Sequence, residues 1–313
     1  MRRRVPDLSR QALPRLAARR PRRARPRRHP RRSRRHPRAR RAPACGPHSG
    51  PDGSRTVSDA TRPAHARVTG IALARRAGAE LLGTGMLVTV VVGSGIAAQR
   101  LTTDPGLRLL ENSIATALGL GVLILLLGPV SGAHFNPLVS AADTLLGRRH
   151  RTGLPLPILA VYIAAQILGG IGGAALANLM FAVPTTLSST DRATPGTVLG
   201  EVVATAGLVL LIAGLARAGR SVPVVAAAVG AYIGAAYWFT SSTSLANPAV
   251  TIGRVFTDTF AGIAPASVLP FLAAQLVGAG IGVALTILLF PHATTETGDL
   301  VAEPVLTETR ETP

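Results

Sequence analysis

The chain has 313 residues, of which 47% are hydrophobic and only 16% are charged, and its mean hydropathy is +0.34. This composition favours a multi-pass membrane protein over a soluble domain. The formal net charge of +19 would by itself suggest a nucleic-acid partner, but 22 of the 34 basic residues, all arginine, lie in residues 1–67. The rest of the chain carries 12 arginines and 12 acidic residues, so we expect no nucleic-acid partner for it.

Residues 1–67 form an Arg- and Pro-rich tail with too few apolar residues to offset the entropy of folding. Such a tail could bind anionic lipid or nucleic acid by charge, or could be a targeting peptide, although no apolar stretch with a cleavage site follows it. We favour a start codon assigned too far upstream, with Val57 or Val68 as the start. The only cysteine, Cys45, lies in this tail, which excludes disulfides and cysteine metal sites elsewhere. Residues 293–313 are expected to be a second, acidic and disordered tail.

Six apolar runs are long enough to cross a bilayer, which takes about 20 residues. Arginines precede the first run and follow the second and fourth, so the positive-inside rule places both termini in the cytoplasm. We expect a multi-pass protein of a bacterial plasma membrane. The six predicted spans are Arg75–Ala98, Leu109–Pro129, Leu156–Phe181, Thr197–Leu215, Val222–Phe239 and Val268–Phe290.

Two further apolar segments, Phe135–Leu146 and Ala246–Phe260, are too short to cross and too apolar for loops. They are typical of re-entrant half-helices. Non-helical backbone at membrane depth is tolerated only where protein or a water-filled cavity covers it. Two such segments therefore predict a pore or a binding site.

The chain contains two copies of one unit, with three landmarks in the same order. Each copy has a Glu-x-x-x-Thr pair in its first span, then an Asn-Pro, then an Ala-Ala-Gln in its last span. Three spans per copy is an odd number, so the second copy is inverted relative to the first. The two half-helices must then enter from opposite faces and meet near the middle. The three landmarks are Glu80, Asn136 and Gln166 in the first copy, and Glu201, Asn247 and Gln275 in the second.

The segments Ser131–Leu138 and Ser244–Ala249 resemble the paired Asn-Pro-Ala boxes of the major intrinsic protein family, the aquaporins and aquaglyceroporins. The resemblance covers about residues 70–292. It implies an all-α membrane protein with six transmembrane helices and two re-entrant half-helices in an inverted repeat. It also implies a channel domain over 68–292, with repeats 72–181 and 197–290, and a homotetramer with one pore per subunit.

Asn136-Pro137 and Asn247-Pro248 are also ordinary helix starts, because Asn is a favoured N-cap and Pro a favoured first helical residue. Their occurrence in both copies favours a pore role. A helix N-terminus carries about half a positive charge, so two of them at the bilayer centre repel cations, and each Asn amide can donate to a passing water. The first box reads Asn-Pro-Leu, and the bulk of Leu138, in the place of Ala249, is expected to crowd the junction.

Glu80 and Glu201 lie inside spans, where a carboxylate is costly and usually functional or paired. The family resemblance assigns them to accepting backbone amides and bracing the half-helix loops; a proton relay is the alternative. Gln166 and Gln275 are expected to bond between helices rather than bind solute. His134 is expected either to line the cytoplasmic vestibule or to pack beneath the loop, and the sequence does not decide between these.

The family builds an outer constriction from four positions, one usually an arginine after the second box, and here that place is Val250. Counting by the family's spacing puts Thr116, Ala235 and Ser244 at the others. Such small residues predict a wide constriction. Arg254, one turn after Val250, could reach back as a substitute, although a pair with Asp258 is the expectation we prefer.

These features predict a passive channel for water or small uncharged solutes, such as glycerol-like polyols and metalloid hydroxides such as arsenous acid. An ion-coupled secondary transporter also uses inverted repeats, but beyond the two glutamates the membrane domain offers no spare intramembrane acid for a coupling ion. No grouping of nucleophile, base and metal ligands points to an enzyme, and we expect neither a metal nor a cofactor.

Overall fold

The structure, a computed structural model, describes residues 70–148 and 152–291. The chain divides into the units Met1–Arg62 and Pro63–Pro313, and every described residue belongs to the second unit. The expectations for the tails 1–67 and 293–313, and for Arg149 and Arg151 in the orientation argument, lie outside the described residues.

All regular structure in residues 70–148 and 152–291 is helical. Six of the helices are long and apolar enough to cross a membrane, which confirms the six predicted spans. The spans are α1 (Gly70–Leu101), α2 (Pro105–Ser131), α4 (Leu156–Met180), α5 (Pro195–Arg217), α6 (Val222–Phe239) and α8 (Pro265–Leu289), and the short elements are α3 (Pro137–Gly147), α7 (Pro248–Gly253) and η2 (Arg254–Phe256).

The packing of the spans repeats between the two halves. α1 packs on α4 and α2 in the first half, and α5 packs on α8 and α6 in the second, while α2 and α6 join the halves. Glycines allow the closest approaches: a β-carbon on Gly169 would lie 2.3 Å from the Leu81 carbonyl oxygen, and one on Gly278 would lie 2.5 Å from that of Val202. Leu81 and Val202 each follow a landmark glutamate, so the same contact occurs in both copies.

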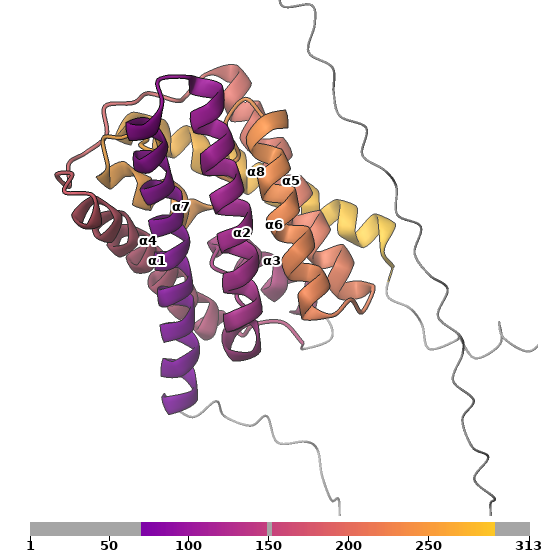
Figure 1. The fold of residues 1–313 in the computed structure, drawn as a ribbon. Coiled ribbons are helices and arrows are strands. Elements are labelled where there is room, and N and C mark those ends of the chain that lie inside the picture. Colours follow the sequence, from indigo (N-terminus) through magenta and orange to yellow (C-terminus); the bar gives the residue numbers. More distant parts are fainter. Residues whose placement is uncertain (1–69, 149–151, 292–313) are drawn as a thin grey trace, which may run out of the picture. The chain divides into compact units, whose positions relative to one another are not determined.

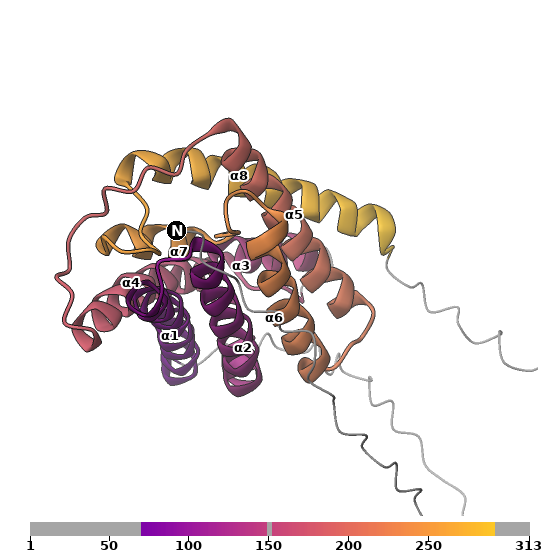
Figure 2. The same cartoon turned by 45° about the horizontal axis from the view of Figure 1, so that its top comes forward.

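The two half-helices lie among the six long helices (Figures 1 and 2). α3 contacts α4, α5 and α8, whereas α7 contacts α4, α8 and α1, and α3 and α7 also contact each other. Each begins with proline after an asparagine N-cap whose side-chain oxygen accepts a backbone amide of its own first turn. The repeat thus brings the two Asn-Pro starts together inside the bundle.

The second half-helix is shorter than the sequence predicted. We expected Ala246–Phe260, but regular helix ends at Phe256, and residues 257–264 are irregular. Asn178 of α4 donates from Nδ2 to the Phe256 carbonyl oxygen (2.9 Å) and accepts from Thr257 Oγ1 (2.8 Å). These two bonds take up the backbone and side-chain groups at that point, so the helix ends there and the chain turns back.

Candidate pore and its lining

The loops before the two half-helices are held by carboxylates from the first span of each repeat. Glu80 accepts the backbone amides of His134 (3.0 Å) and Phe135 (2.7 Å). Glu201 accepts those of Leu245 and Ala246, both at 2.8 Å. Both carboxylates are fully buried, and a buried charge is tolerated only when it is compensated by such bonds.

A glutamine from the last span of each repeat completes the arrangement. Gln166 Nε2 donates to Glu80 Oε2 (2.8 Å) and to Ser140 Oγ of α3 (3.0 Å). Gln275 Nε2 donates to Glu201 Oε2 (2.6 Å) and to Thr251 Oγ1 of α7 (2.9 Å). The glutamines therefore join span, loop and half-helix, and neither lines the central cavity.

The same loops hold five non-glycine residues in the left-handed backbone region, Thr243 with a φ of 62° and four others. The φ angles of these four are 51° at Ala133, 49° at Phe135, 52° at Ser244 and 48° at Ala246. Each such residue costs on the order of 1–3 kcal/mol and persists only where its surroundings fix it. The two glutamates bond to amides within these strained turns, so their charge holds the loops in a conformation that turns the backbone toward the centre.

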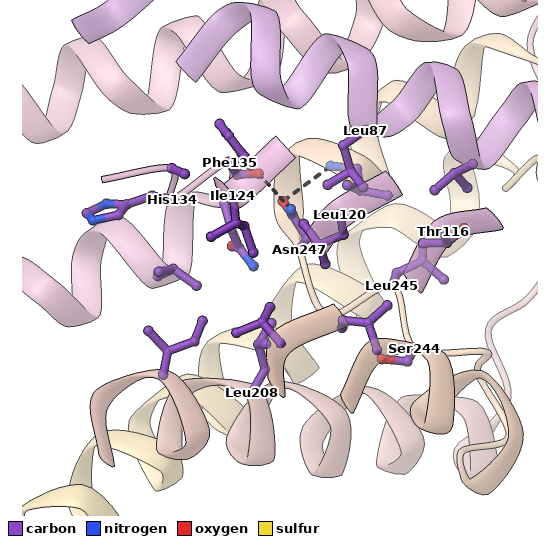
Figure 3. A pocket seen from close by; sticks show the side chains of 18 of the residues that line it. Leu87, Thr116, Leu120, Ile124, His134, Phe135, Leu208, Ser244, Leu245 and Asn247 are labelled. Atoms are coloured by element: carbon purple, nitrogen blue, oxygen red, sulfur yellow. Dashed lines mark hydrogen bonds between the residues drawn. The ribbon is translucent and has the colours of Figure 1, made fainter. Parts of the chain in front are cut away.

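At the centre, the two asparagines bond to each other's loops. Asn136 Nδ2 donates to the Ala246 carbonyl oxygen and Asn247 Nδ2 to that of Phe135, both at 2.8 Å. Figure 3 shows the second of these bonds. Each Oδ1 meanwhile caps its own half-helix. A carboxamide nitrogen carries two hydrogens, so one N–H of each asparagine is left to donate elsewhere, and both side chains line one central cavity.

This cavity has a free volume of about 60 Å³. Apart from the asparagines, its middle is walled by apolar side chains that recur every four residues along the spans, which puts them on one helix face. His134 lies at one end of it and Thr116 and Ser244 at the other, with Asn247 between (Figure 3). We call these the α3 end and the α7 end. The apolar stripes are Leu87 and Val91 on α1, Leu120 and Ile124 on α2, Leu208 and Ile212 on α5, and Val229 and Ile233 on α6.

The α7 end contains three of the four residues predicted for the constriction. Thr116, Ser244 and Val250 all line the cavity and are nearly inaccessible from outside. Ser244 Oγ has no hydrogen-bond partner in residues 70–148 and 152–291. Thr116 Oγ1 lies 3.1 Å from the hydroxyl of Tyr237. The lining of this end thus combines hydroxyl groups with the apolar side chain of Val250.

Ala235, the fourth predicted residue, does not lie at the cavity. It is exposed on α6, and Tyr237 lines the cavity from that helix instead. Counting back from the second box failed because it assumed a loop length between α6 and the box. The stripe Val229, Ile233 and Tyr237 has helical spacing and was the signal that could have identified the tyrosine. Tyr237 makes this end narrower and more polar than alanine would.

Arg254 lines the cavity, contrary to our preferred pairing with Asp258. Asp258 instead accepts hydrogen bonds from Ser188 and from the backbone and hydroxyl of Ser189. The Nε of Arg254 donates to the Ala261 carbonyl oxygen. Its two terminal nitrogens make no hydrogen bond with any described residue, so they are available at the α7 end.

His134 lines both the central cavity and a second one, of about 250 Å³, beyond the α3 end. Its Nδ1 lies 3.0 Å from Ser140 Oγ. Ser140 Oγ also accepts from Gln166 Nε2, so His134 is linked to the hydrogen-bond network that holds the first loop. The histidine therefore faces this second cavity, the vestibule, and its ring also packs edge to face against Tyr162 of α4.

Leu138 does not crowd the junction of the half-helices. It packs with Ala142 of α3, Val209 of α5 and Ala279 and Val283 of α8, and it is not among the residues that line the central cavity. The added bulk of the first box is thus accommodated between α3 and its neighbours. Asn136, Pro137, Asn247, Pro248 and Ala249 meanwhile form the two helix starts as the sequence predicted.

Comparison with known proteins gives three findings. The sequence profile described as "Major intrinsic protein" matches residues 67–244. The aquaglyceroporin AqpS of Rhizobium meliloti is 50% identical over 215 residues, which are 68% of this chain and 89% of that protein. Aquaporin-8 of Rattus norvegicus is 40% identical over 101 residues, 32% of this chain and 35% of that protein.

Among solved structures, the aquaglyceroporin from Plasmodium falciparum aligns with a TM-score of 0.54 and 19% identity, over 70% of this chain and 95% of that chain. At this identity the likeness concerns the fold. It supports the arrangement of six spans around two half-helices that the hydrogen bonds describe.

Proposed function

This chain belongs to the major intrinsic protein family and is a passive channel for water and small uncharged solutes; from this premise we propose that its central cavity passes glycerol-sized polyols as well as water. The observation that carries the proposal is the reciprocal bonding of Asn136 and Asn247 to each other's loops, 2.8 Å on both sides. It fixes two N–H donors at the midpoint of an otherwise apolar passage.

The two donors define what can cross. A water or hydroxyl that accepts from both asparagines directs its own hydrogens away from the centre, which interrupts a chain of hydrogen bonds that could carry protons. The positive ends of the two half-helices oppose cations at the same point. Glu80 and Glu201 act here as braces rather than proton relays, because the backbone amides of the loops and the glutamines occupy their oxygens.

The α7 end sets the solute class. Tyr237, Thr116 and Arg254 line it with hydroxyls and a guanidinium, and Val250 lines it with methyl groups. A polyol likewise combines hydroxyls with C–H groups, so it can use both kinds of lining. The volume of about 60 Å³ fits this, because one water needs about 10–15 Å³ by the same measure, so there is room for a short file of waters or one small polyol.

The similarity to a protein named aquaglyceroporin also supports a polyol as solute. Neutral metalloid hydroxides such as arsenous acid share the size and hydroxyl character of such solutes and belong to the same class. Nothing observed at the α7 end distinguishes them from polyols.

The assembly and orientation are part of the same proposal. We place both termini in the cytoplasm of a bacterial cell, since Arg75, Arg76, Arg148 and Arg217 lie at the side where α3 and α5 end. The α7 end is then the outer mouth. Family membership supports a homotetramer, and the large exposed apolar residues of the spans, such as Leu118, Leu126 and Leu179, support a location in the plasma membrane.

Proteoliposomes test the proposal. Vesicles with the protein, first shrunk in a glycerol gradient, should re-swell faster than protein-free vesicles, and the rate should not change when proton and sodium gradients are dissipated. A flux that needs such a gradient would favour the coupled transporter. Fast water flow without glycerol entry would contradict the proposed solute, and no flux of either would contradict the channel itself.

A further inference from the structure

The α7 end of the cavity contains a buried positive charge without a direct counter-charge. Arg254 is only 4% exposed and lines the cavity. Its Nε donates to the Ala261 carbonyl oxygen, and its two terminal nitrogens have no partner in the described part of the chain. A buried cation without a counter-charge carries an uncompensated free energy of desolvation. A ligand that compensates the charge would therefore bind favourably.

The nearest carboxylates do not provide that compensation. Glu201 acts electrostatically on Arg254, but its oxygens already accept from Leu245, Ala246 and Gln275. Asp258 is occupied by Ser188 and Ser189. The lining of the central cavity includes no acidic residue.

A second guanidinium adds to the positive field. Arg192 donates from Nε to the Gly262 carbonyl oxygen (2.6 Å) and from a terminal nitrogen to that of Phe260 (2.7 Å). Arg254 bonds to Ala261, so three consecutive carbonyls hold both arginines. Burial and the charge of Arg254 lower the pKa of Arg192 to about 10, and it stays charged at neutral pH.

The cavity that Arg254 lines also offers an unused hydroxyl. Ser244 is 4% exposed, its Oγ has no partner within the described ranges, and it lines the same end as Arg254. Figure 3 shows Ser244 and Thr116 at this end. A free hydroxyl and two free guanidinium nitrogens form a set of donors that suits a ligand with two acceptor oxygens.

We propose that the α7 end is a binding site for a small monovalent oxyanion of the carboxylate class, such as formate, held by the terminal nitrogens of Arg254 and the hydroxyl of Ser244. The inference rests on the proposed pore. The anion does not cross, because the apolar walls beyond, with Leu120 and Leu208, give no compensation for its lost hydration. Bound formate therefore occupies the solute path and slows the passage of neutral solutes.

Re-swelling in glycerol tests the effect on flux, with external formate compared with equal concentrations of chloride and of neutral formamide. At a pH where formate is fully ionised, it should reduce the glycerol rate of the wild-type channel several-fold, while formamide should not. Arg254→Gln should remove the dependence on formate, whatever its own basal rate. Arg108→Gln is the matched control, since Arg108 lies at the same end of the bundle and bonds to Thr102 and Gln99 away from the cavity.

A direct measurement of formate binding tests the site independently of solute flux. Saturation-transfer NMR on the formate proton, with the purified full-length protein, should show contact that is lost in Arg254→Gln. Ser244→Ala should fold and bind about tenfold more weakly, since one hydrogen bond to a charged group is removed. If the channel passes glycerol but formate neither binds nor inhibits, this inference alone is overturned. It is also overturned if formate slows glycerol flux through Arg254→Gln as much as through the wild type. Absence of glycerol flux would instead refute the proposed function.

Discussion

The two half-helices follow equivalent paths, but they pack against the bundle in different ways. α7 meets α4 through backbone: a β-carbon on Gly253 would lie 2.5 Å from the Gly170 carbonyl oxygen, and one on Gly170 would lie 2.6 Å from that of Ala249. α3 meets α8 through side chains, with Leu138, Ala142 and Ala279 at the equivalent positions. The residues of α3 at this contact are larger than those of α7, and the residue of α8 that meets them is larger than the glycine of α4.

The bonds that hold the loops do not share this difference. In both halves the glutamate accepts two loop amides and one glutamine Nε2, and Glu80 additionally accepts from Ser131 Oγ (2.6 Å). The comparison teaches that the geometry of the two asparagines requires the carboxylate and glutamine, whereas the spacing of the half-helix from the bundle is adjustable. This is why Asn-Pro-Leu can take the place of Asn-Pro-Ala in the first half.

The ends of the half-helices differ in charge. Asp143 of α3 and Arg254 after α7 occupy equivalent positions in the two repeats, seven residues after Asn136 and Asn247. Asp143 Oδ2 accepts from the Leu154 amide (2.9 Å) and lines the vestibule at the α3 end. Arg254 faces the central cavity. The two mouths of a structurally symmetric pore are therefore electrically different.

The largest effect is expected from the glutamates. In Glu80→Gln and Glu201→Gln the side chain loses its charge and one acceptor oxygen, so at least one backbone amide of a strained loop is left unbonded. Each bond to the charged group contributes about 1.5–3 kcal/mol, and both variants should lose several kcal/mol of stability and most of their flux. Thermal unfolding in detergent and glycerol re-swelling measure this. An intact channel in one variant only would show that the two braces are not equivalent.

A smaller effect, and an unequal one, is expected from the packing positions. Gly253→Ala places a methyl group against the Gly170 carbonyl, and overpacking of this kind costs about 1–3 kcal/mol. Ala142→Gly, the reverse exchange at the equivalent position of α3, should cost about 1 kcal/mol through helix propensity alone. Unfolding temperatures of both variants in the same detergent provide the comparison. Equal losses would show that the two contacts are alike.

A third prediction affects selectivity more than stability. Tyr237→Ala enlarges the α7 end and should raise the passage of solutes larger than glycerol, such as erythritol, relative to water. Ala235→Leu changes an exposed position on α6 and should leave both rates as they are. Re-swelling with a size series of polyols distinguishes these variants. A shift in selectivity for Ala235→Leu, with none for Tyr237→Ala, would instead place Ala235 at the constriction, as the spacing from the second box predicted.

Much of this architecture could be predicted from the sequence, because the repeated landmarks fix the order and inversion of the spans. The apolar runs located all six helices. The end of the second half-helix could not be predicted, since it depends on bonds from Asn178, far away in the chain. The apolar composition of the segment continues past the point where the backbone turns.

The asparagines were predictable for the same reason, since each copy presents its own box. Tyr237 was missed because the count back from the second box ran through the irregular segment 240–246, and the preferred pairing of Arg254 with Asp258 was wrong because the backbone becomes irregular at 257–264. Short loops with left-handed residues do not keep a fixed spacing between flanking elements. Asp258 is four residues from Arg254, the spacing of a helical pair, but the helix that would pair them has already ended.

The ratio of glycerol to water permeability, measured by stopped flow for the wild-type channel and Val250→Arg, tests the central claim most directly. The wild-type channel should pass both solutes. Arg at 250 replaces the apolar wall of the α7 end with a second guanidinium and should lower glycerol passage at least about tenfold, equivalent to about 1.4 kcal/mol, with water reduced less. Val250→Leu, which adds bulk without charge, should lie between. An unchanged glycerol rate in Val250→Arg would contradict the account.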